Sequence, residues 1–290
     1  MSRSSFVAAC AQMRSGRDPK ANIDQAVGLI REAATAGAAY VQTPEMSNTV
    51  NRDRAGLFDA ISPEDRDPML EAFRTLAREK RVHIHAGSLA ILRDDGKVAN
   101  RAFLITPDGE IEARYDKIHL FDVDLPNGES WRESRTYTGG DCAVVADLPA
   151  GRLGLSICYD VRFAYLYRAL AEAGAEILSA PACFTRQTGE AHWVVLHRAR
   201  AIETGSFMIS AAQAGLHEDG RETFGHSIIV DPWGRVLAEA GDQPGVVMAE
   251  IDMALVADAR GRIPTLQHTR TFDLDHVEAP VAKAPLARSA

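Results

Sequence analysis

The sequence predicts an α/β fold with mixed sheets, in which parallel and antiparallel strands occur together. Short apolar runs alternate with segments of helical spacing, which is typical of strands and helices that follow one another along the chain. Turn signals at 107–109 (PDG) and 149–151 (PAG) join neighbouring apolar runs as hairpins, so the sheets cannot be purely parallel. No repeat or linker stands out. We therefore expect one domain over residues 1–276 and an Ala- and Pro-rich tail at 277–290, an arm or a disordered segment.

The N-terminal half begins with an apolar strand and a helix. Asp18 and Pro19 open that helix and Gly37 ends it. The polar stretch 47–61 has no period and is expected to be a loop. Expected strands lie at 6–12, 38–41, 82–91, 98–106 and 110–115, and expected helices at 18–36 and 67–80.

The C-terminal half begins with an irregular stretch at 116–140, and a loop this long in a compact domain is usually functional or mobile. A short apolar run stops at Cys158, where Asp160 is expected to cap a helix that Gly174 ends. Thr188 is expected to cap the next helix. Expected strands lie at 143–148, 152–157, 176–180, 207–212, 227–230, 236–239 and 246–251, and expected helices at 160–173 and 190–204.

Composition and charge exclude several classes of protein. The net charge is −8 and no run of Lys and Arg forms a basic stripe, so nucleic acid is not an expected partner. No apolar stretch approaches the roughly 20 residues of a membrane span, and the N-terminus does not read as a signal peptide. The four cysteines form no CxxC pair, which indicates reduced thiols and a cytoplasmic protein.

Cys158 lies at the tip of a predicted strand with a helix starting just behind it. Backbone N–H groups converge at such a turn and, together with the helix dipole, favour a thiolate and any oxyanion formed beside it. A lone cysteine is nevertheless more often a packed core residue. Glu45 and Lys117 also follow predicted strands, and strand ends meet at one edge of a sheet. A carboxylate could take the thiol proton and an ammonium could stabilise an oxyanion, but spacing alone does not select these residues.

Three motifs carry a family resemblance. They are TPEMS at 43–47, YDKIHLFDVDLP at 115–126, and GRLGLSI followed by CYDVRF at 151–163. With these motifs the chain resembles the nitrilase superfamily of carbon–nitrogen hydrolases from about Val7 to about His268. The resemblance implies a four-layer α-β-β-α sandwich with two mixed sheets, and cysteine hydrolase chemistry with a Glu-Lys-Cys triad and no cofactor or metal.

The same resemblance assigns roles to individual residues. Cys158 matches the nucleophile, Lys117 the catalytic lysine and Glu45 the general base. A second glutamate that supports the lysine matches Glu133 in WRES, with Glu129 as the competing candidate. The backbone N–H of Tyr159 would complete the oxyanion hole.

Further segments, among them 169–184 and 225–234, resemble the branch that acts on deaminated glutathione, with the ω-amidase branch close behind. The implied activity is hydrolysis of the terminal amide of a small carboxylate-bearing substrate to acid and ammonia, through a thioester. An N-carbamoyl-amino-acid hydrolase, a nitrilase and a non-catalytic metabolite-binding protein are the alternatives. Phe184, Arg186 and Thr188 are candidate substrate contacts; Arg186 departs from the small residues usual there and either binds a carboxylate or points to solvent.

Other residues have structural interpretations that compete with functional ones. His83 and His85 alternate on a strand as metal ligands do, but no further ligands accompany them and no metal site is expected. Asp160 and Arg162 are expected to form a structural ion pair rather than a substrate contact. His192 and Trp193 either face the pocket or belong to the core or a helix cap. By resemblance we also expect a homodimer or larger homo-oligomer.

Overall fold

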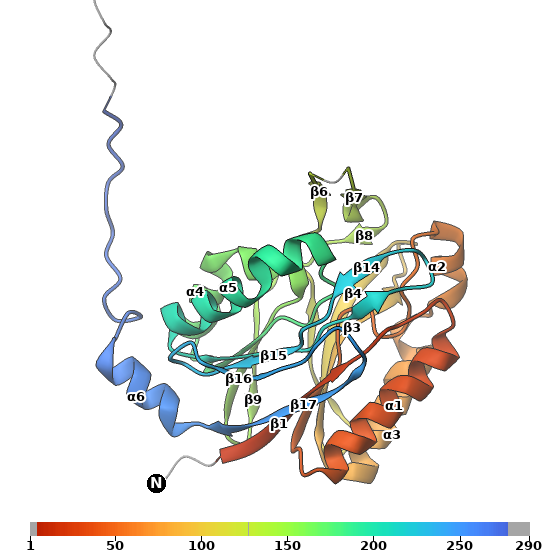
Figure 1. The fold of residues 1–290 in the computed structure, drawn as a ribbon, viewed down its shortest axis with the longest axis horizontal. Coiled ribbons are helices and arrows are strands. Elements are labelled where there is room, and N and C mark those ends of the chain that lie inside the picture. The colour runs from red at the N-terminus through yellow and green to blue at the C-terminus, as the bar shows by residue number, and fades with distance from the viewer. Residues whose placement is uncertain (1–4, 127, 278–290) are drawn as a thin grey trace, which may run out of the picture.

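The computed structural model describes residues 5–126 and 128–277 as two facing β-sheets between two layers of helices (Figure 1). On one side lie α1 (Pro19–Thr35) and α3 (Pro68–Lys80), and on the other lie α4 (Ala164–Glu172) and α5 (Arg186–Thr204). The predicted four-layer α-β-β-α sandwich is confirmed. Residues 278–290, which hold nearly all of the expected tail, lie outside the described residues.

The first sheet has seven strands, with parallel pairing at its centre and antiparallel pairing on both flanks. A short seventh strand, β8, pairs in parallel with β4. In spatial order the other strands are β17 (Gly245–Asp252), β1 (Ser5–Gln12), β2 (Tyr40–Gln42), β3 (His83–Leu92), β4 (Val98–Ile105) and β5 (Ile111–Asp116), and β8 is Tyr137–Thr138.

The second sheet has six strands, again with a parallel centre and antiparallel edges. Two hairpins, β6 with β7 and β13 with β14, form separate two-stranded sheets outside the two large ones. In spatial order the sheet contains β16 (Val236–Glu239), β15 (Ile228–Val230), β12 (Phe207–Ser210), β11 (Ile177–Ser179), β10 (Gly151–Leu155) and β9 (Val144–Leu148); the hairpins are β6 (Asp122–Asp124), β7 (Ser130–Arg132), β13 (Ala214–Leu216) and β14 (Glu222–Phe224).

Strand β1 shows why the sheets stack. Its residues alternate between two cores, because successive side chains of a strand point to opposite faces. Ala8 and Cys10 belong to the core between the two sheets, whereas Ala9 and Ala11 belong to the core beneath α1 and α3. A continuous apolar run is therefore buried on both faces, as the sequence of β1 predicts.

Asp-Pro pairs open two helices as predicted. The carboxylate of Asp18 accepts from the backbone N–H of Lys20 at the start of α1, and that of Asp67 accepts from Leu70 at the start of α3. Each carboxylate satisfies an N–H group that the helix itself leaves unpaired.

Three local predictions are wrong. The stretch expected to be a loop contains α2 (Arg54–Ala60), which the Asp53 carboxylate caps at the N–H of Gly56. Helix α5 begins at Arg186 with Thr185 at its N-cap position, so Thr188 lies inside the helix. Asp160 does not cap α4, because it lies within a 3₁₀ turn that precedes that helix.

Two further stretches contain elements that the sequence did not reveal. The irregular segment at 116–140 holds β6, β7, β8 and a 3₁₀ turn (Glu133–Arg135), and α6 (Ala254–Arg262) follows β17. No helix among residues 5–126 and 128–277 is long and apolar enough to cross a bilayer.

Candidate active site

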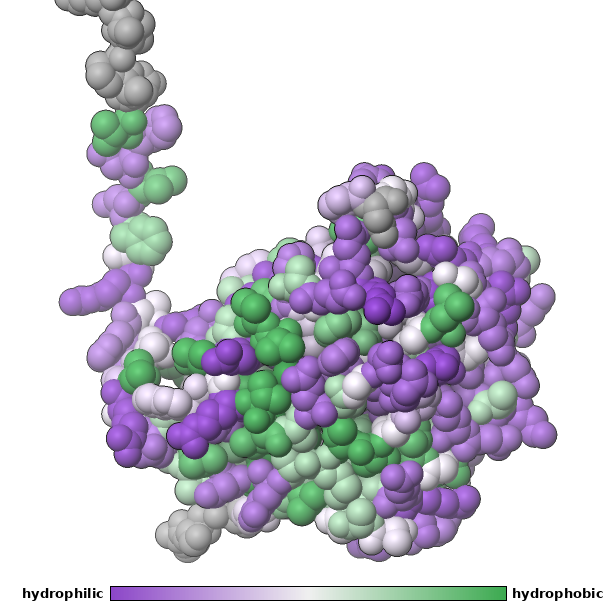
Figure 2. All heavy atoms as spheres, in the orientation of Figure 1, coloured by the Kyte–Doolittle hydropathy of each residue, from purple (hydrophilic) through white to green (hydrophobic). Residues whose placement is uncertain are grey.

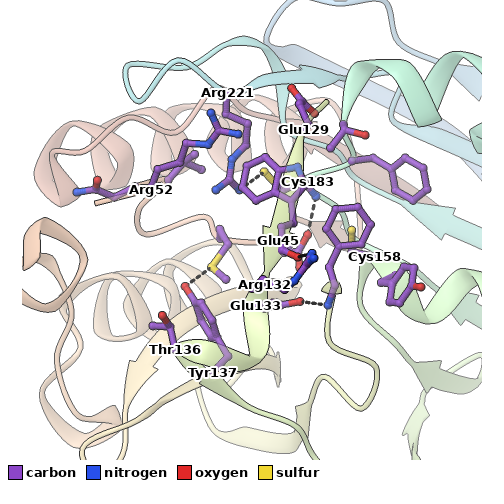
Figure 3. A pocket seen from close by; sticks show the side chains of 18 of the residues that line it. Glu45, Arg52, Glu129, Arg132, Glu133, Thr136, Tyr137, Cys158, Cys183 and Arg221 are labelled. Carbon is purple, nitrogen blue, oxygen red and sulfur yellow. Dashed lines mark hydrogen bonds between the residues drawn. The ribbon is translucent and has the colours of Figure 1, made fainter. Parts of the chain in front are cut away.

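A cavity of about 1060 Å³ opens where strands of both sheets end. The cavity is lined by Glu45, Lys117, Glu133 and Cys158. Figure 3 shows the side chains of Glu45, Glu133 and Cys158 pointing toward one another. Strand ends bring these residues together. Lys117 follows β5 and Glu45 follows β2 in the first sheet, and Cys158 follows β10 in the second.

Lys117 lies between two carboxylates. Its Nζ is 2.9 Å from Glu45 Oε1 and 2.9 Å from Glu133 Oε2. The side chains of Lys117 and Glu45 are almost completely buried, with 2% and 5% exposed. Of the two candidate glutamates, Glu133 is the one that contacts the lysine, whereas Glu129 lines the cavity.

Neutral donors complete the carboxylate network. Asn100 Nδ2 donates to Glu45 Oε1 at 2.9 Å and to Glu133 Oε1 at 3.1 Å. The backbone N–H of Cys183 donates to Glu45 Oε2 at 2.7 Å, and that of Phe121 donates to Glu133 Oε2 at 2.6 Å. Buried carboxylates need such partners, because an unpaired buried charge is costly.

These contacts set the charges of the pair. Burial alone would disfavour the ammonium, but Glu133 and Glu45 outweigh it and hold the pKa of Lys117 well above its usual range. Burial would likewise raise the pKa of Glu45, but the charge and hydrogen bond of Lys117 lower it below its ordinary value. Lys117 is therefore a cation and Glu45 a carboxylate at neutral pH.

Cys158 occupies a tight turn with a positive φ of 49°, a conformation that non-glycine residues adopt rarely. Its N–H donates to Pro181 O at 2.9 Å, while Asp160 Oδ2 accepts from the Ile157 N–H at 2.9 Å and from Tyr115 Oη at 2.7 Å. These bonds fix the turn at both ends.

The Cys158 thiol is neutral at rest. Burial raises its pKa well above the usual range, the Glu45 carboxylate raises it further, and Lys117 offsets this only in part. The charge of the Glu45 carboxylate acts on the thiol, which makes this carboxylate the candidate acceptor for its proton. A neutral thiol beside an ionised carboxylate is the resting state of a nucleophile activated by a general base.

The predicted substrate contacts divide into two groups. Tyr159, Phe184 and Thr188 line the cavity. Arg186 is not among the lining residues, because it forms ion pairs with Glu190 at 3.1 Å and Glu222 at 2.5 Å on the surface. A substrate carboxylate at Arg186 is therefore not supported, and the side chain lies on the exposed side of α5.

The expected ion pair between Asp160 and Arg162 is also wrong. The Asp160 carboxylate accepts from the backbone N–H of His119 at 3.1 Å, in addition to its bonds within the turn. The Arg162 guanidinium lies over the Phe184 ring, 5.1 Å from its centroid, and contacts His192 Nδ1 at 3.1 Å. Asp160 thus stabilises the turn, but with other partners.

The structure also places the histidine and tryptophan residues for which the sequence left a functional interpretation open. His85 is buried and its Nδ1 lies 2.7 Å from Tyr40 Oη, and the part of the chain that the structure describes holds no group of three or more potential metal ligands. Trp193 is fully buried and donates to His226 O at 2.7 Å, so it belongs to the core, while His192 is exposed.

Several residues in the cavity wall, or in contact with it, escaped sequence reasoning. Asn100 had a usable signal, because it is a polar residue inside the otherwise apolar run of β4 and is 1% exposed. No such signal marks the three residues that reach the cavity from the segment before α2, from β7 and from the turn before β14, which are Arg52, Trp131 and Arg221.

Known proteins match the chain over nearly its whole length. The family model described as carbon–nitrogen hydrolase matches residues 7–261. A deaminated glutathione amidase from Synechocystis is 41% identical over 91% of this chain and 97% of its own, and the human omega-amidase NIT2 is 36% identical over 94% and 98%. The crystal structure of Saccharomyces cerevisiae Nit3, a nitrilase-superfamily member, superposes with a TM-score of 0.81 at 26% identity, over 90% of this chain and 94% of its own.

The resemblance predicted from the motifs is thus confirmed by three independent kinds of similarity. The chain belongs to the carbon–nitrogen hydrolase family and is an enzyme that hydrolyses carbon–nitrogen bonds of amides other than peptide bonds.

Proposed function

We propose that this enzyme hydrolyses the terminal amide of a small carboxylate-bearing substrate to acid and ammonia, through a thioester on Cys158. The observation that carries the proposal is a buried, neutral thiol in the same cavity as Glu45, which Lys117 holds ionised through an ion pair of 2.9 Å. The similarity to a deaminated glutathione amidase and to an omega-amidase supports this class of substrate.

In the first half-reaction the amide carbonyl oxygen points toward Lys117 Nζ and the Tyr159 N–H. As Cys158 Sγ bonds to the carbonyl carbon, its proton passes to Glu45, so a free thiolate need not accumulate. The oxyanion is stabilised by two donors, each contributing about 3–4 kcal/mol to the lowering of the barrier. Glu45 then protonates the departing nitrogen, ammonia leaves and the thioester remains.

The second half-reaction uses the same groups. Glu45, again ionised, takes a proton from water as the water oxygen attacks the thioester carbonyl carbon. The carbon–sulfur bond breaks, the proton returns to Sγ, and the acid leaves. Lys117 keeps its charge throughout, because the two carboxylates beside it favour the ammonium form. Glu133 positions the lysine and takes no proton.

The test is the variant Cys158→Ala, assayed by ammonia release on a panel of deaminated glutathione, α-ketoglutaramate, carbamoyl amino acids and nitriles. We expect turnover to disappear with the fold intact by circular dichroism. Intact-mass spectrometry of the parent enzyme mixed with substrate should show an acyl adduct that Cys158→Ala lacks.

The exposed thiol of Cys142 provides the control for that measurement. Cys142→Ala should keep both the turnover and the adduct. Turnover by Cys158→Ala at more than a trace of the parent rate would contradict the proposal. Parent activity on nitriles or carbamoyl amino acids, but on no amide, would replace the proposed substrate class.

We also propose a homodimer or larger homo-oligomer. Val195 and Ile202 are exposed on one face of α5, with Trp233 and Leu237 exposed nearby in the chain around β16. Figure 2 shows hydrophobic surface gathered over this region of the molecule. An apolar patch of this kind marks an interaction surface, and light scattering in solution would measure the expected mass of at least two chains.

Two further proposals concern organisation. We propose that residues 1–276 act as one catalytic domain, because Glu45 and Lys117 follow strands of one sheet and Cys158 a strand of the other. We propose a cytoplasmic location, supported by cysteines that are all free thiols. Cell fractionation would test the location.

A further inference from the structure

A second group of side chains lines the cavity away from Cys158. The Arg52 guanidinium lies 4.3 Å and the Arg221 guanidinium 4.4 Å from the centroid of the Trp131 ring. Figure 3 shows Arg52 and Arg221 close together, on the far side of the labelled site residues from Cys158. We name Arg52, Trp131 and Arg221 the arginine–tryptophan cluster. Its three members come from separate parts of the chain and meet only at the cavity.

Arg221 is a guanidinium with unused donors. Its Nη1 lies 3.4 Å from Cys183 Sγ, a weak acceptor. Its Nη2 forms a long ion pair with the buried Asp219 Oδ2 at 3.8 Å, which is beyond hydrogen-bond distance. Its Nε is buried without a hydrogen-bond partner among the described residues. Burying a guanidinium in this way is costly unless another group completes its hydrogen bonds.

Arg52 has no carboxylate partner in the part of the chain that the structure covers, and its guanidinium packs over the Trp131 ring. Arg132 lines the same cavity and differs, because Asp124 holds its Nη2 at 2.8 Å. Two cations over one ring repel each other, and an anion that contacts both would relieve the repulsion. The cluster therefore has the charge, the free donors and the fixed platform of an anion site.

We propose that Arg52 and Arg221, held on Trp131, bind a carboxylate of the substrate remote from the amide that Cys158 attacks. The inference rests on the proposed amidase function and deepens it, since it assigns the residues that select an acidic substrate. A guanidinium matches a carboxylate with two parallel N–H donors, which is why arginine is suited to this task.

The test compares monoamides of dicarboxylic acids of increasing chain length with their methyl esters at the remote carboxyl. The quantity measured is the ratio of kcat/KM for the acid to kcat/KM for its ester. We expect the parent enzyme to prefer the acid at one chain length. Arg221→Met and Arg52→Met should each lower that ratio by about tenfold or more, because a charge-assisted hydrogen bond is lost, while the ester keeps its kcat/KM within about threefold.

Arg54→Met is the matched control. Arg54 lines the same cavity, but its guanidinium lies over Phe58 at 5.2 Å rather than over Trp131. This substitution removes an equal charge from the cavity wall and should leave the ratio at the parent value. If Arg221→Met does not fold, Arg52→Met still tests the proposal, because Arg52 is exposed.

Two results would overturn the proposal. One is an unchanged ratio in both cluster variants, and the other is an equal fall in Arg54→Met. Failure of the amidase function is distinguishable, because the parent enzyme would then hydrolyse no amide of the series. In that case calorimetric binding of the dicarboxylic acid to Cys158→Ala, with and without Arg221→Met, decides the carboxylate site by itself.

Discussion

Asn100 is a neutral residue that links the two carboxylates beside Lys117. A single Nδ2 group donates to both Glu45 and Glu133, which both form ion pairs with Lys117. Each carboxylate accepts from one side of the same amide, so their separation from each other is fixed. Asn100 acts through Glu45 and is therefore a positioning residue.

Replacing Asn100 by Asp should shift the pH dependence of catalysis. Glu45 must be ionised to accept the thiol proton, so activity is present above its pKa and is lost as the pH falls through it. Because the pKa of Glu45 is lowered from 4.5, the acid limb of the parent lies below that value. Asn100→Asp removes a donor and adds a like charge, so the limb should move to higher pH.

The measurement is kcat/KM against pH. At neutral pH we also expect kcat/KM to fall roughly tenfold to a hundredfold, the range expected for loss of a hydrogen bond to a charged group. Asn51→Asp is the control for the pH of the acid limb, since Asn51 lines the cavity and accepts from the Asp53 N–H in a way that Asp can reproduce. An acid limb at the same pH in Asn100→Asp and the parent would show that Asn100 does not position Glu45.

Residues inside contiguous motifs could be predicted, whereas residues that reach the cavity by packing could not. Cys158, Lys117 and Glu45 lie in motifs that the sequence displays directly. Asn100 owes its position to strand pairing, where Lys117 N donates to Asn100 O at 2.9 Å. Arg221 owes its position to the β13–β14 hairpin, whose turn signal Asp219-Gly220 does not by itself show that the turn faces the cavity. Such pairings depend on the fold as a whole, so local patterns do not reveal them.

At the scale of elements, Gly87 lets β3 approach the segment that carries Glu45. A Cβ at this position would lie 1.9 Å from Thr43 O and 2.5 Å from Pro181 Cβ, closer than any real contact. Thr43 and Pro44 immediately precede Glu45, and Pro181 O holds the N–H of Cys158. The absent side chain thus lets the segment that leads to Glu45, the proposed base, lie close to the segment that holds the N–H of Cys158, the proposed nucleophile.

Gly87→Ala should therefore lower both stability and activity. We expect a loss of about 3 kcal/mol in the free energy of unfolding, at the upper end of overpacking costs, because backbone rather than a flexible side chain must move. Urea denaturation measures the loss, and kcat at a temperature where the variant is folded measures the displacement of Glu45. Unchanged stability and kcat would mean that the close approach is not required.

Gly28→Ala is the matched control in helix α1. A Cβ there meets nothing within 4 Å, and the residue is exposed. Alanine in a helix interior should raise stability by about 0.5–1 kcal/mol, since it removes backbone freedom from the unfolded chain. Both substitutions replace glycine by alanine, but Gly87→Ala should lower the free energy of unfolding and Gly28→Ala should raise it.

Element boundaries show the limits of local signals in the same way. The Asp-Pro pairs predicted α1 and α3, because proline fixes the helical φ and aspartate caps the first turn. The N-cap position of helix α5 lies at Thr185, three residues before the predicted cap Thr188, and Thr185 makes no side-chain cap hydrogen bond, so capping chemistry does not mark this end. Helix α2 lies in a polar stretch with one buried residue, Leu57, so no apolar period marks it.

At the scale of the whole molecule, each sheet is associated with one fully buried histidine. His85 lies on β3 of the first sheet, with Nδ1 at 2.7 Å from Tyr40 Oη. His197 lies on α5, which covers the second sheet, with Nδ1 at 2.8 Å from Trp193 O and Nε2 at 2.9 Å from Ser210 Oγ. Burial lowers the pKa of His85 to about 3 and that of His197 to about 4.

These two side chains should make the protein acid-labile well above the range where carboxylates titrate. Both pKa values are depressed from 6.5 in the folded state, so below pH 6.5 the unfolded chain binds protons that the folded chain does not. The contribution of these histidines to the free energy of unfolding is therefore complete above pH 6.5. It falls as the pH drops, by up to about 1.4 kcal/mol per pH unit for each histidine. Burial lowers the pKa of His83 and His217 in the same direction and raises that of Asp67, which acts oppositely.

The prediction is measured as the free energy of urea unfolding at pH values from 7.5 to about 5. His85→Gln and His197→Gln should each flatten the dependence by up to about 1.4 kcal/mol per pH unit, since glutamine takes up no proton. His268→Gln, at an exposed position, should leave the slope unchanged. Equal slopes in the parent and both buried-site variants would contradict the assignment. A smaller slope only in His85→Gln would place the acid sensitivity in the first sheet, beside the segment that leads from β2 to Glu45.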